Sequence, residues 1–322
     1  MTNRAAFLIV YRQPFANGIG KTNRMKPMQL FWRSNAGLLR RGGALLTRLS
    51  DRAYFRAEPK LSSAERDLLN QNEKLRNCHR GQRCFVIGNG PSLTKQDLAP
   101  LAGEITFVMN AFWKHPILDK WQPTYFCFAD PVWHDGSETV KKSFESIRAR
   151  APSATYIFPL AGKQILERDA LLPLASTCFF AFQNQPIGLS VADTFDFTRA
   201  IPFPYSSSQL AIMAAMFMGC TPIYLMGLDH NWLAHRGQDM HFFSGVSIED
   251  HTGELDCPYD EEIEAAGRLW RGYRKLKSLG EAHGIQIVNA TAGGFLDVFE
   301  RVKYESLLDS TFRLQIEANA KA

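Results

Sequence analysis

A short glycine-rich turn, Gly-Asn-Gly-Pro-Ser at Gly88–Ser92, has the residue types that bind a phosphate group. It follows the apolar run Cys84–Ile87, which predicts a buried parallel strand, and precedes Leu93–Leu101, which we expect to be helical. Such a strand-turn-helix unit presents backbone N–H groups and a positive helix end to an anion, and Gly88 and Gly90 would let the backbone approach it. The third glycine of the dinucleotide fingerprint and the Walker lysine-serine pair are both missing, so a tight turn without a ligand is the alternative.

Amide and carboxylate side chains follow five of the predicted strands at the point where each strand ends. They are Asn89, Asn110, Asp130, Asp229 and Asn289. In open α/β sheets, ligands bind outside the carboxyl ends of the strands, so these groups are expected to share one site. Each of them alone is also a common turn former or helix cap, but the five together favour a nucleotide site.

The elements that position these groups alternate between strands and helices, which predicts a parallel sheet with helices on both faces, a Rossmann-like α/β fold. The long apolar helix and the long amphipathic helix are expected at Ser206–Met218 and Glu261–His283, and a first helix with a capping box at Ser62–Arg76. Asp193 and Asp196 lie in a predicted loop with interleaved phenylalanines and are assigned no chemistry. The predicted strands are Cys84–Ile87, Ile105–Met109, Tyr125–Ala129, Thr155–Phe158, Thr177–Phe182, Pro222–Met226 and Gln286–Val288.

Charge divides the chain into a basic N-terminal extension and a mildly acidic body. Residues 1–83 hold 17 Lys and Arg against 5 Asp and Glu, a balance of +12, and the remainder balances at −7. We therefore expect three parts: a basic, mostly helical arm at 1–75, a nucleotide-binding domain at 76–310 and a tail at 311–322. Leucines interleaved with arginines in the arm are compatible with peripheral membrane association, and packing on the main domain is the alternative.

The remaining bulk properties indicate a cytoplasmic protein. The longest apolar run near the N-terminus is too short to span a bilayer, and no signal-peptide pattern is present. The six cysteines form no C-x-x-C pair and are expected to be reduced core residues. No nucleic-acid partner is predicted, because no binding motif accompanies the basic charge; a homo-oligomer is compatible with the sequence.

An ordered set of motifs resembles the MptE-like domain family, whose namesake is a 6-hydroxymethylpterin diphosphokinase and which includes motility accessory factors. The set is VIGNGPSL, MNAFW, FADP and YSSSQLAIMAAMFMGCTPIYLMGLDHNW, and it lies within residues 78–308. More distantly, the same pieces are similar to bacterial sialyltransferases of the Campylobacter type, which use CMP-sialic acid. The resemblance implies a Rossmann-like domain that binds an activated nucleotide.

The resemblance also assigns roles to individual positions. It implies that the Gly88–Ser92 turn lines the nucleotide phosphates and ribose, that Asn110 holds the nucleotide and that Ser207 contacts the base. Asp130 replaces an asparagine of the sialyltransferases, and Ser208 a glycine, while their phosphate-binding tyrosines have no counterpart here. The candidate nucleotide-binding residues are Gly88, Asn89, Gly90, Pro91, Ser92, Asn110, Asp130, Ser207, Ser208, Gly227, Asp229, His230 and Asn289.

Two histidines are candidates for the catalytic base that removes the proton of an acceptor hydroxyl. His241, in DMHFF, matches the histidine motif that the resemblance implies, and His251 lies nearer the long helix. Imidazole has a pKa near neutrality and can accept such a proton. A loop histidine with a structural contact is the alternative for either residue.

The leading hypothesis is therefore a transferase: a glycosyltransferase, sialyltransferase-like, that uses CMP or another nucleotide-sugar donor in surface polysaccharide biosynthesis. This hypothesis requires no catalytic metal. The first alternative is diphosphate transfer from ATP to a hydroxymethylpterin, which needs Mg²⁺ and would use Asp130 and Asp229 as ligands. The second is a non-catalytic, nucleotide-binding scaffold.

Overall fold

The structure is a computed structural model that describes residues 59–190, 192–236, 238, 240–244 and 258–308. Most of the predicted basic arm, the predicted tail at 311–322 and the candidate base His251 lie outside the described residues.

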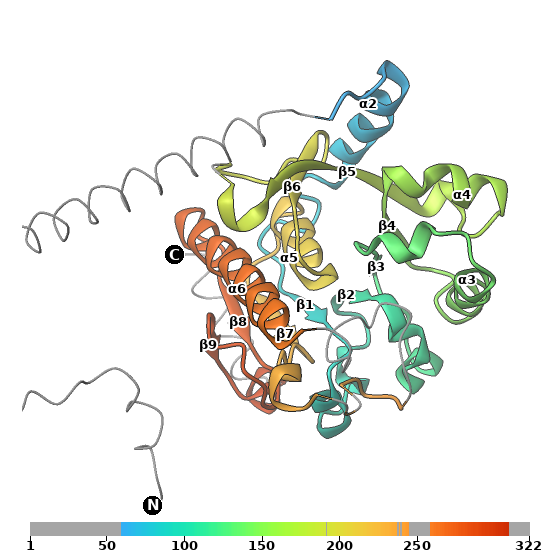
Figure 1. Cartoon of the computed structure of the whole chain (residues 1–322). Coiled ribbons are helices and arrows are strands. Elements are labelled where there is room, and N and C mark those ends of the chain that lie inside the picture. Colours follow the sequence, from blue (N-terminus) through green and yellow to red (C-terminus); the bar gives the residue numbers. More distant parts are fainter. Residues whose placement is uncertain (1–58, 191, 237, 239, 245–257, 309–322) are drawn as a thin grey trace, which may run out of the picture. The chain divides into compact units, whose positions relative to one another are not determined.

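In the described part of the chain, nine strands form a single sheet in which every neighbouring pair is parallel (Figure 1). The order is β6-β5-β4-β3-β2-β1-β7-β8-β9. This arrangement confirms the predicted Rossmann-like α/β fold. The strands are β1 (Cys84–Ile87), β2 (Ile105–Met109), β3 (Tyr125–Cys127), β4 (Thr155–Pro159), β5 (Thr177–Pro186), β6 (Ala200–Phe203), β7 (Ile223–Met226), β8 (Ile287–Asn289) and β9 (Glu300–Arg301).

The strand order reverses between β1 and β7. From β1 the chain adds β2 to β6 in sequence on one side, and then α5 (Ser207–Phe217) returns it to β7 on the other side of β1. Such a reversal leaves a crevice at the carboxyl ends of the two central strands, because the connections that leave them run in opposite directions.

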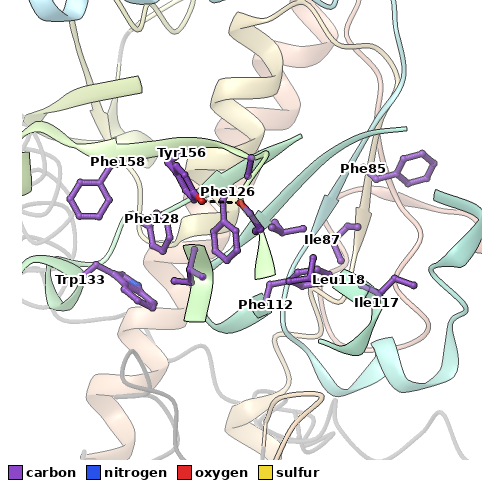
Figure 2. Close-up of a cluster of buried hydrophobic side chains, with 14 of the residues drawn as sticks. Phe85, Ile87, Phe112, Ile117, Leu118, Phe126, Phe128, Trp133, Tyr156 and Phe158 are labelled. Carbon is purple, nitrogen blue, oxygen red and sulfur yellow. Dashed lines mark hydrogen bonds between the residues drawn. The ribbon is translucent and has the colours of Figure 1, made fainter. Parts of the chain in front are cut away.

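Helices cover both faces of the sheet, as the alternating residues of β1 show. Phe85 and Ile87 pack in one core cluster with α3 (Glu138–Arg150), and Cys84 and Val86 pack in a second cluster with α5 and α6 (Tyr259–Ala282). Successive side chains of a strand point to opposite faces, so each face has its own core. Figure 2 shows part of the first cluster, which includes Phe128 and Trp133. The ring centroids of these two residues lie 4.9 Å apart.

The central helix α5 is almost entirely buried, because it lies against the central strands on one side and α6 on the other. Its sequence is apolar all round, as expected of a helix without a solvent face. Ser206 caps it by accepting a hydrogen bond from the Gln209 amide at 3.3 Å. The capped first turn of α5 lies beside the carboxyl ends of the central strands.

The helix predicted at Leu93–Leu101 is wrong. Two short 3₁₀ helices, Pro91–Lys95 and Ala99–Leu101, occupy this region. The backbone becomes extended at Gln96, with φ of −126° and ψ of 123°, and Pro100 lacks the N–H donor that a continuous α-helix would need at that position. The glycine-rich turn therefore does not lie at the N-terminus of an α-helix.

Other boundaries differ in detail. The first helix has the predicted capping box between Ser62 and Glu65, but α2 (Ser63–Asn70) gives way to a 3₁₀ helix at Gln71–Leu75. The predicted loop that holds Asp193 and Asp196 continues into the edge strand β6, and the short strand β9 and the helices α3 and α4 (Lys163–Arg168) were not predicted. Short edge strands carry little hydrophobic alternation, which is the signal that sequence patterns provide.

Candidate functional site

A cavity of about 480 Å³ lies at the carboxyl ends of β1, β2, β3 and β7, where the strand order reverses. The start of α5 and one side of α6 complete its wall. Most of the predicted site residues line it although they come from separate segments of the chain. These are Gly88, Asn89, Gly90, Asn110, Asp130, Ser207, Ser208, Gly227, Asp229, His230 and His241.

Three of the predicted residues that the structure describes do not line this cavity. Pro91 begins the 3₁₀ helix after the turn, and Ser92 is buried behind it. Asn289 is fully buried at the end of β8, where its amide donates to the Leu296 carbonyl oxygen at 2.9 Å and accepts from the Thr291 amide at 3.0 Å. In the structure, Asn289 organises a loop.

The glycines of the turn are required by a neighbouring chain segment. A Cβ at Gly90 would overlap the Asp229 carboxylate and lie 2.7 Å from the Gly227 carbonyl oxygen; a Cβ at Gly88 would lie 2.6 Å from the same oxygen. The Gly90 amide donates to that oxygen at 2.9 Å. The loops after β1 and β7 therefore pack directly against each other, and this close approach explains both glycines without a ligand.

Two polar side chains join the strand ends to α5. Ser207 Oγ donates to Asn110 Oδ1 at 2.9 Å and accepts from the Ala129 amide at 3.2 Å. Asn110 has a left-handed backbone, with φ of 51°, which asparagine tolerates better than most residues. Asn89 donates from Nδ2 to the Met109 carbonyl oxygen at 3.1 Å, whereas its Oδ1 is buried without a hydrogen-bond partner in the described structure.

The first turn of α5 supplies the helix end that was predicted after the glycine-rich turn. Ser206, Ser207 and Ser208 all line the cavity, and α5 has no acidic residue in its first turn. The first N–H groups of any α-helix lack intrahelical partners, and the helix dipole makes that end positive. An anion in the cavity can therefore be stabilised by α5.

Two carboxylates also line the cavity, and both accept hydrogen bonds from nearby residues. Asp130 Oδ1 accepts from the Val132 amide at 3.0 Å, and Asp229 Oδ2 accepts from Ser92 Oγ at 2.8 Å. Burial raises the pKa of Asp229 above its usual value, against the lowering effect of the Ser92 hydrogen bonds. Burial thus disfavours the charged form of Asp229.

His230 begins a chain of hydrogen bonds that ends at the cap of α5. Its Nε2 lies 2.7 Å from the Tyr273 hydroxyl, which lies 2.6 Å from Ser208 Oγ, and Ser208 Oγ lies 2.8 Å from Ser206 Oγ. Burial lowers the pKa of His230 to about 4 and raises that of Tyr273 to about 12. Both side chains are therefore neutral at neutral pH. The chain of hydrogen bonds links α6 and the loop after β7 to the start of α5.

The candidate base His241 lies on the cavity wall in the segment 240–244. Its ring stacks on Phe243, with ring centroids 4.9 Å apart. The next residue, Phe242, donates from its amide to the Asn89 carbonyl oxygen at 2.9 Å. This hydrogen bond holds the histidine segment beside the glycine-rich turn.

Residues of α6 and of the segment before α5 also line the cavity and were not predicted. Ala265, Arg268 and Leu269 of α6 line the cavity, as do Phe203 and Tyr205. Spacing of i, i+3 and i+4 places the three α6 residues on one face of the helix, which the predicted amphipathic pattern could have indicated. The pattern alone did not identify what this face contacts.

Mg²⁺, which the diphosphokinase alternative needs, has two carboxylate candidates in the cavity wall, Asp130 and Asp229. Mg²⁺ is commonly held by one or two carboxylates together with substrate phosphates, so this donor set fits the ion. Within the described ranges, no group of three or more His, Cys, Asp or Glu side chains could hold a metal ion. No helix in those same ranges has the length and apolar character to cross a bilayer.

In comparisons with known proteins, no family model matches the chain and no curated protein matches it.

Proposed function

We propose that this chain is a nucleotide-dependent transferase of the MptE-like type, and specifically a glycosyltransferase with a nucleotide-sugar donor. The observation that carries the proposal is the shared cavity: Asn89, Asn110 and Asp130 follow three different strands, and they meet the first turn of α5 in the crevice between β1 and β7. Open α/β folds bind nucleotides in this crevice. A cavity of about 480 Å³ is in the size range of small-molecule sites.

The polarity of the wall favours one orientation of the donor. The anionic phosphate is best stabilised at the start of α5, beside Ser207 and Ser208, and not at the Gly88–Ser92 turn that the resemblance implies. The Asp130 carboxylate repels phosphate but accepts hydrogen bonds from ribose hydroxyls or base amino groups, so the nucleoside belongs towards β3. The transferred sugar then lies towards the loop after β7.

His241 is the base in this proposal. It accepts the proton of the acceptor hydroxyl while the acceptor oxygen forms a bond to the sugar carbon. The bond between that carbon and the donor phosphate oxygen breaks, and its electron pair remains on the phosphate. A surface polysaccharide precursor or another glycoconjugate at the cytoplasmic side of a membrane is the proposed acceptor, since the basic residues of 1–83 suit an anionic surface.

The proposal is tested by calorimetric titration of the protein with CMP, UDP, GDP and ADP, followed by incubation with the matching nucleotide sugars. We expect one base to bind with a clear preference and its sugar donor to be hydrolysed or transferred. His241→Asn should abolish turnover and leave nucleotide binding within about twofold of wild type, because the base acts in the transition state. Absence of binding to all four nucleotides would contradict the proposal.

The two carboxylates on the wall favour a second candidate, diphosphate transfer from ATP to 6-hydroxymethylpterin. Asp130 and Asp229 would hold Mg²⁺, which bridges and neutralises the phosphates in such reactions. Consumption of ATP that requires both Mg²⁺ and the pterin would support it. Turnover that is unchanged by EDTA would instead favour the glycosyltransferase.

A further inference from the structure

Arg268 is the only lysine or arginine among the described residues that line the cavity. It lies on α6, on the same helix face as Ala265 and Leu269. Two cations that do not line the cavity have other contacts: Lys114 lies over the ring of Phe243 at 3.9 Å from its centroid, and Arg236 pairs with the buried Glu262. A cation that faces a cavity of this kind is a candidate anion ligand.

The ion pair of Arg268 within its own helix is weak. Its Nη1 lies 3.6 Å from Glu264 Oε2, and the Glu264 side chain is 76% exposed. Exposed pairs between residues one helical turn apart contribute only a few tenths of a kcal/mol, because water screens both charges. The guanidinium can therefore give up Glu264 for a better anion at little cost.

The charge of Arg268 acts on the segment that leads into α5. Burial raises the pKa of Tyr205, and the positive charges of Arg268 and Arg271 oppose this rise. Tyr205 lines the cavity and directly precedes the cap residue Ser206. The guanidinium and the first turn of α5 thus act on the same region of the cavity.

We propose that Arg268 binds the phosphate of the donor nucleotide opposite the first turn of α5 and stabilises the charge left on that phosphate when the sugar departs. The proposal rests on the proposed function. It gives Arg268 the phosphate-binding role that tyrosines have in the sialyltransferases and that no tyrosine of this chain matches by position. A guanidinium binds two phosphate oxygens at once through its planar pair of N–H groups. Asp130, on the β3 side of the cavity, repels phosphate, so the anion is directed towards α5 and α6.

The test compares nucleotides with their nucleosides. Binding of CMP and cytidine, and of the UMP, GMP and AMP pairs, is measured by calorimetry for wild type, Arg268→Gln and Arg268→Lys. Arg274→Gln is the matched control, because Arg274 is exposed on the same helix and does not line the cavity. Circular dichroism and thermal melts establish that each variant is folded.

Arg268→Gln is expected to lower the affinity for the preferred nucleotide by about 10- to 100-fold, the range for loss of a charged hydrogen-bonding partner. The affinity for the corresponding nucleoside should not change. Arg268→Lys should show a smaller loss, since it keeps the charge but not the paired donors. Equal weakening of nucleotide and nucleoside, or no loss in Arg268→Gln, would overturn the proposal while leaving nucleotide binding intact.

Titration with inorganic phosphate and pyrophosphate separates this inference from the proposed function. If wild type binds no nucleotide but binds pyrophosphate in a manner that Arg268→Gln abolishes, Arg268 remains an anion ligand and the proposed function fails. If wild type binds neither nucleotides nor the inorganic anions, the role of Arg268 is refuted together with the function.

Discussion

Ser207 Oγ donates a hydrogen bond to Asn110 Oδ1 at 2.9 Å, and this contact joins the first residue of α5 to the residue that follows β2. The same oxygen accepts from the Ala129 amide after β3. One hydroxyl therefore fixes two strand ends and a helix start relative to one another. The shape of the cavity depends on this junction as much as on the residues that face a ligand.

Ser207→Ala should destabilise the protein by about 1–3 kcal/mol, because it leaves the buried Ala129 amide without an acceptor. Urea unfolding at neutral pH measures the change. The control is Ser146→Ala on α3, where the hydroxyl donates only to the Lys142 carbonyl oxygen of its own helix. Equal losses in the two variants would argue against a structural junction at Ser207.

Gly90→Ala should destabilise the folded protein although it adds only one methyl group. The added methyl group would overlap the Asp229 carboxylate, so the loop after β7 must shift at a cost of about 1–3 kcal/mol or more. Gly267→Ala in α6 is the matched control, because its methyl group would come no closer than 3.7 Å to Arg271 and should stabilise the helix by up to about 1 kcal/mol. Thermal unfolding measures the stability of both variants. A melting temperature of Gly90→Ala equal to that of wild type would contradict the described packing.

Asp229→Asn should stabilise the folded protein at neutral pH and weaken its function. Burial raises the pKa of Asp229, so the folded state resists ionisation of this carboxyl and loses stability as the pH rises through its folded pKa. The amide removes that penalty and can still accept from Ser92. We expect a higher melting temperature at pH 7, with a smaller difference between variant and wild type at pH 3. A lower melting temperature at pH 7 would contradict this expectation.

Acidification should destabilise the protein between pH 6.5 and pH 4, in part through His115. Burial, with a contribution from Arg150, lowers its pKa from 6.5 to about 4, and its Nδ1 accepts from the Ile117 amide at 3.1 Å. In this window the unfolded state binds a proton that the folded state does not, so stability falls as the pH falls. His115 caps the 3₁₀ helix Pro116–Asp119; asparagine at this position can still cap it but cannot titrate. His115→Asn should therefore lose less stability than wild type between pH 7 and pH 5 in urea unfolding, and an unchanged loss would contradict the assignment.

Several elements were correctly predicted because their signals are local. The apolar runs at Cys84–Ile87 and Ile105–Met109 form β1 and β2 at the predicted bounds, and the strand-end residues Asn89, Asn110 and Asp130 line one cavity. Parallel strands bring their carboxyl ends to the same edge, so the grouping of these residues follows once the strands are identified. Their roles remain a prediction.

The helix end that faces the cavity was assigned to the wrong segment. The glycine-rich turn resembles a phosphate loop in sequence, but only short 3₁₀ helices follow it, and α5 supplies the helix end from a site more than 100 residues later. The sequence around Ser206 shows a capped apolar helix. That local sequence does not indicate which strand ends lie beside the cap, because their positions depend on the crossover from β6 to β7.

Local patterns were enough to predict the alternation of strands and helices, the parallel sheet and the polar residues at its carboxyl edge, since hydrophobic period and turn chemistry act over a few residues. The order of the nine described strands, the position of the first turn of α5 beside their carboxyl ends and the presence of Arg268 on the cavity wall became known from the three-dimensional fold. These features depend on contacts between residues far apart in the chain, and a local pattern does not specify such contacts.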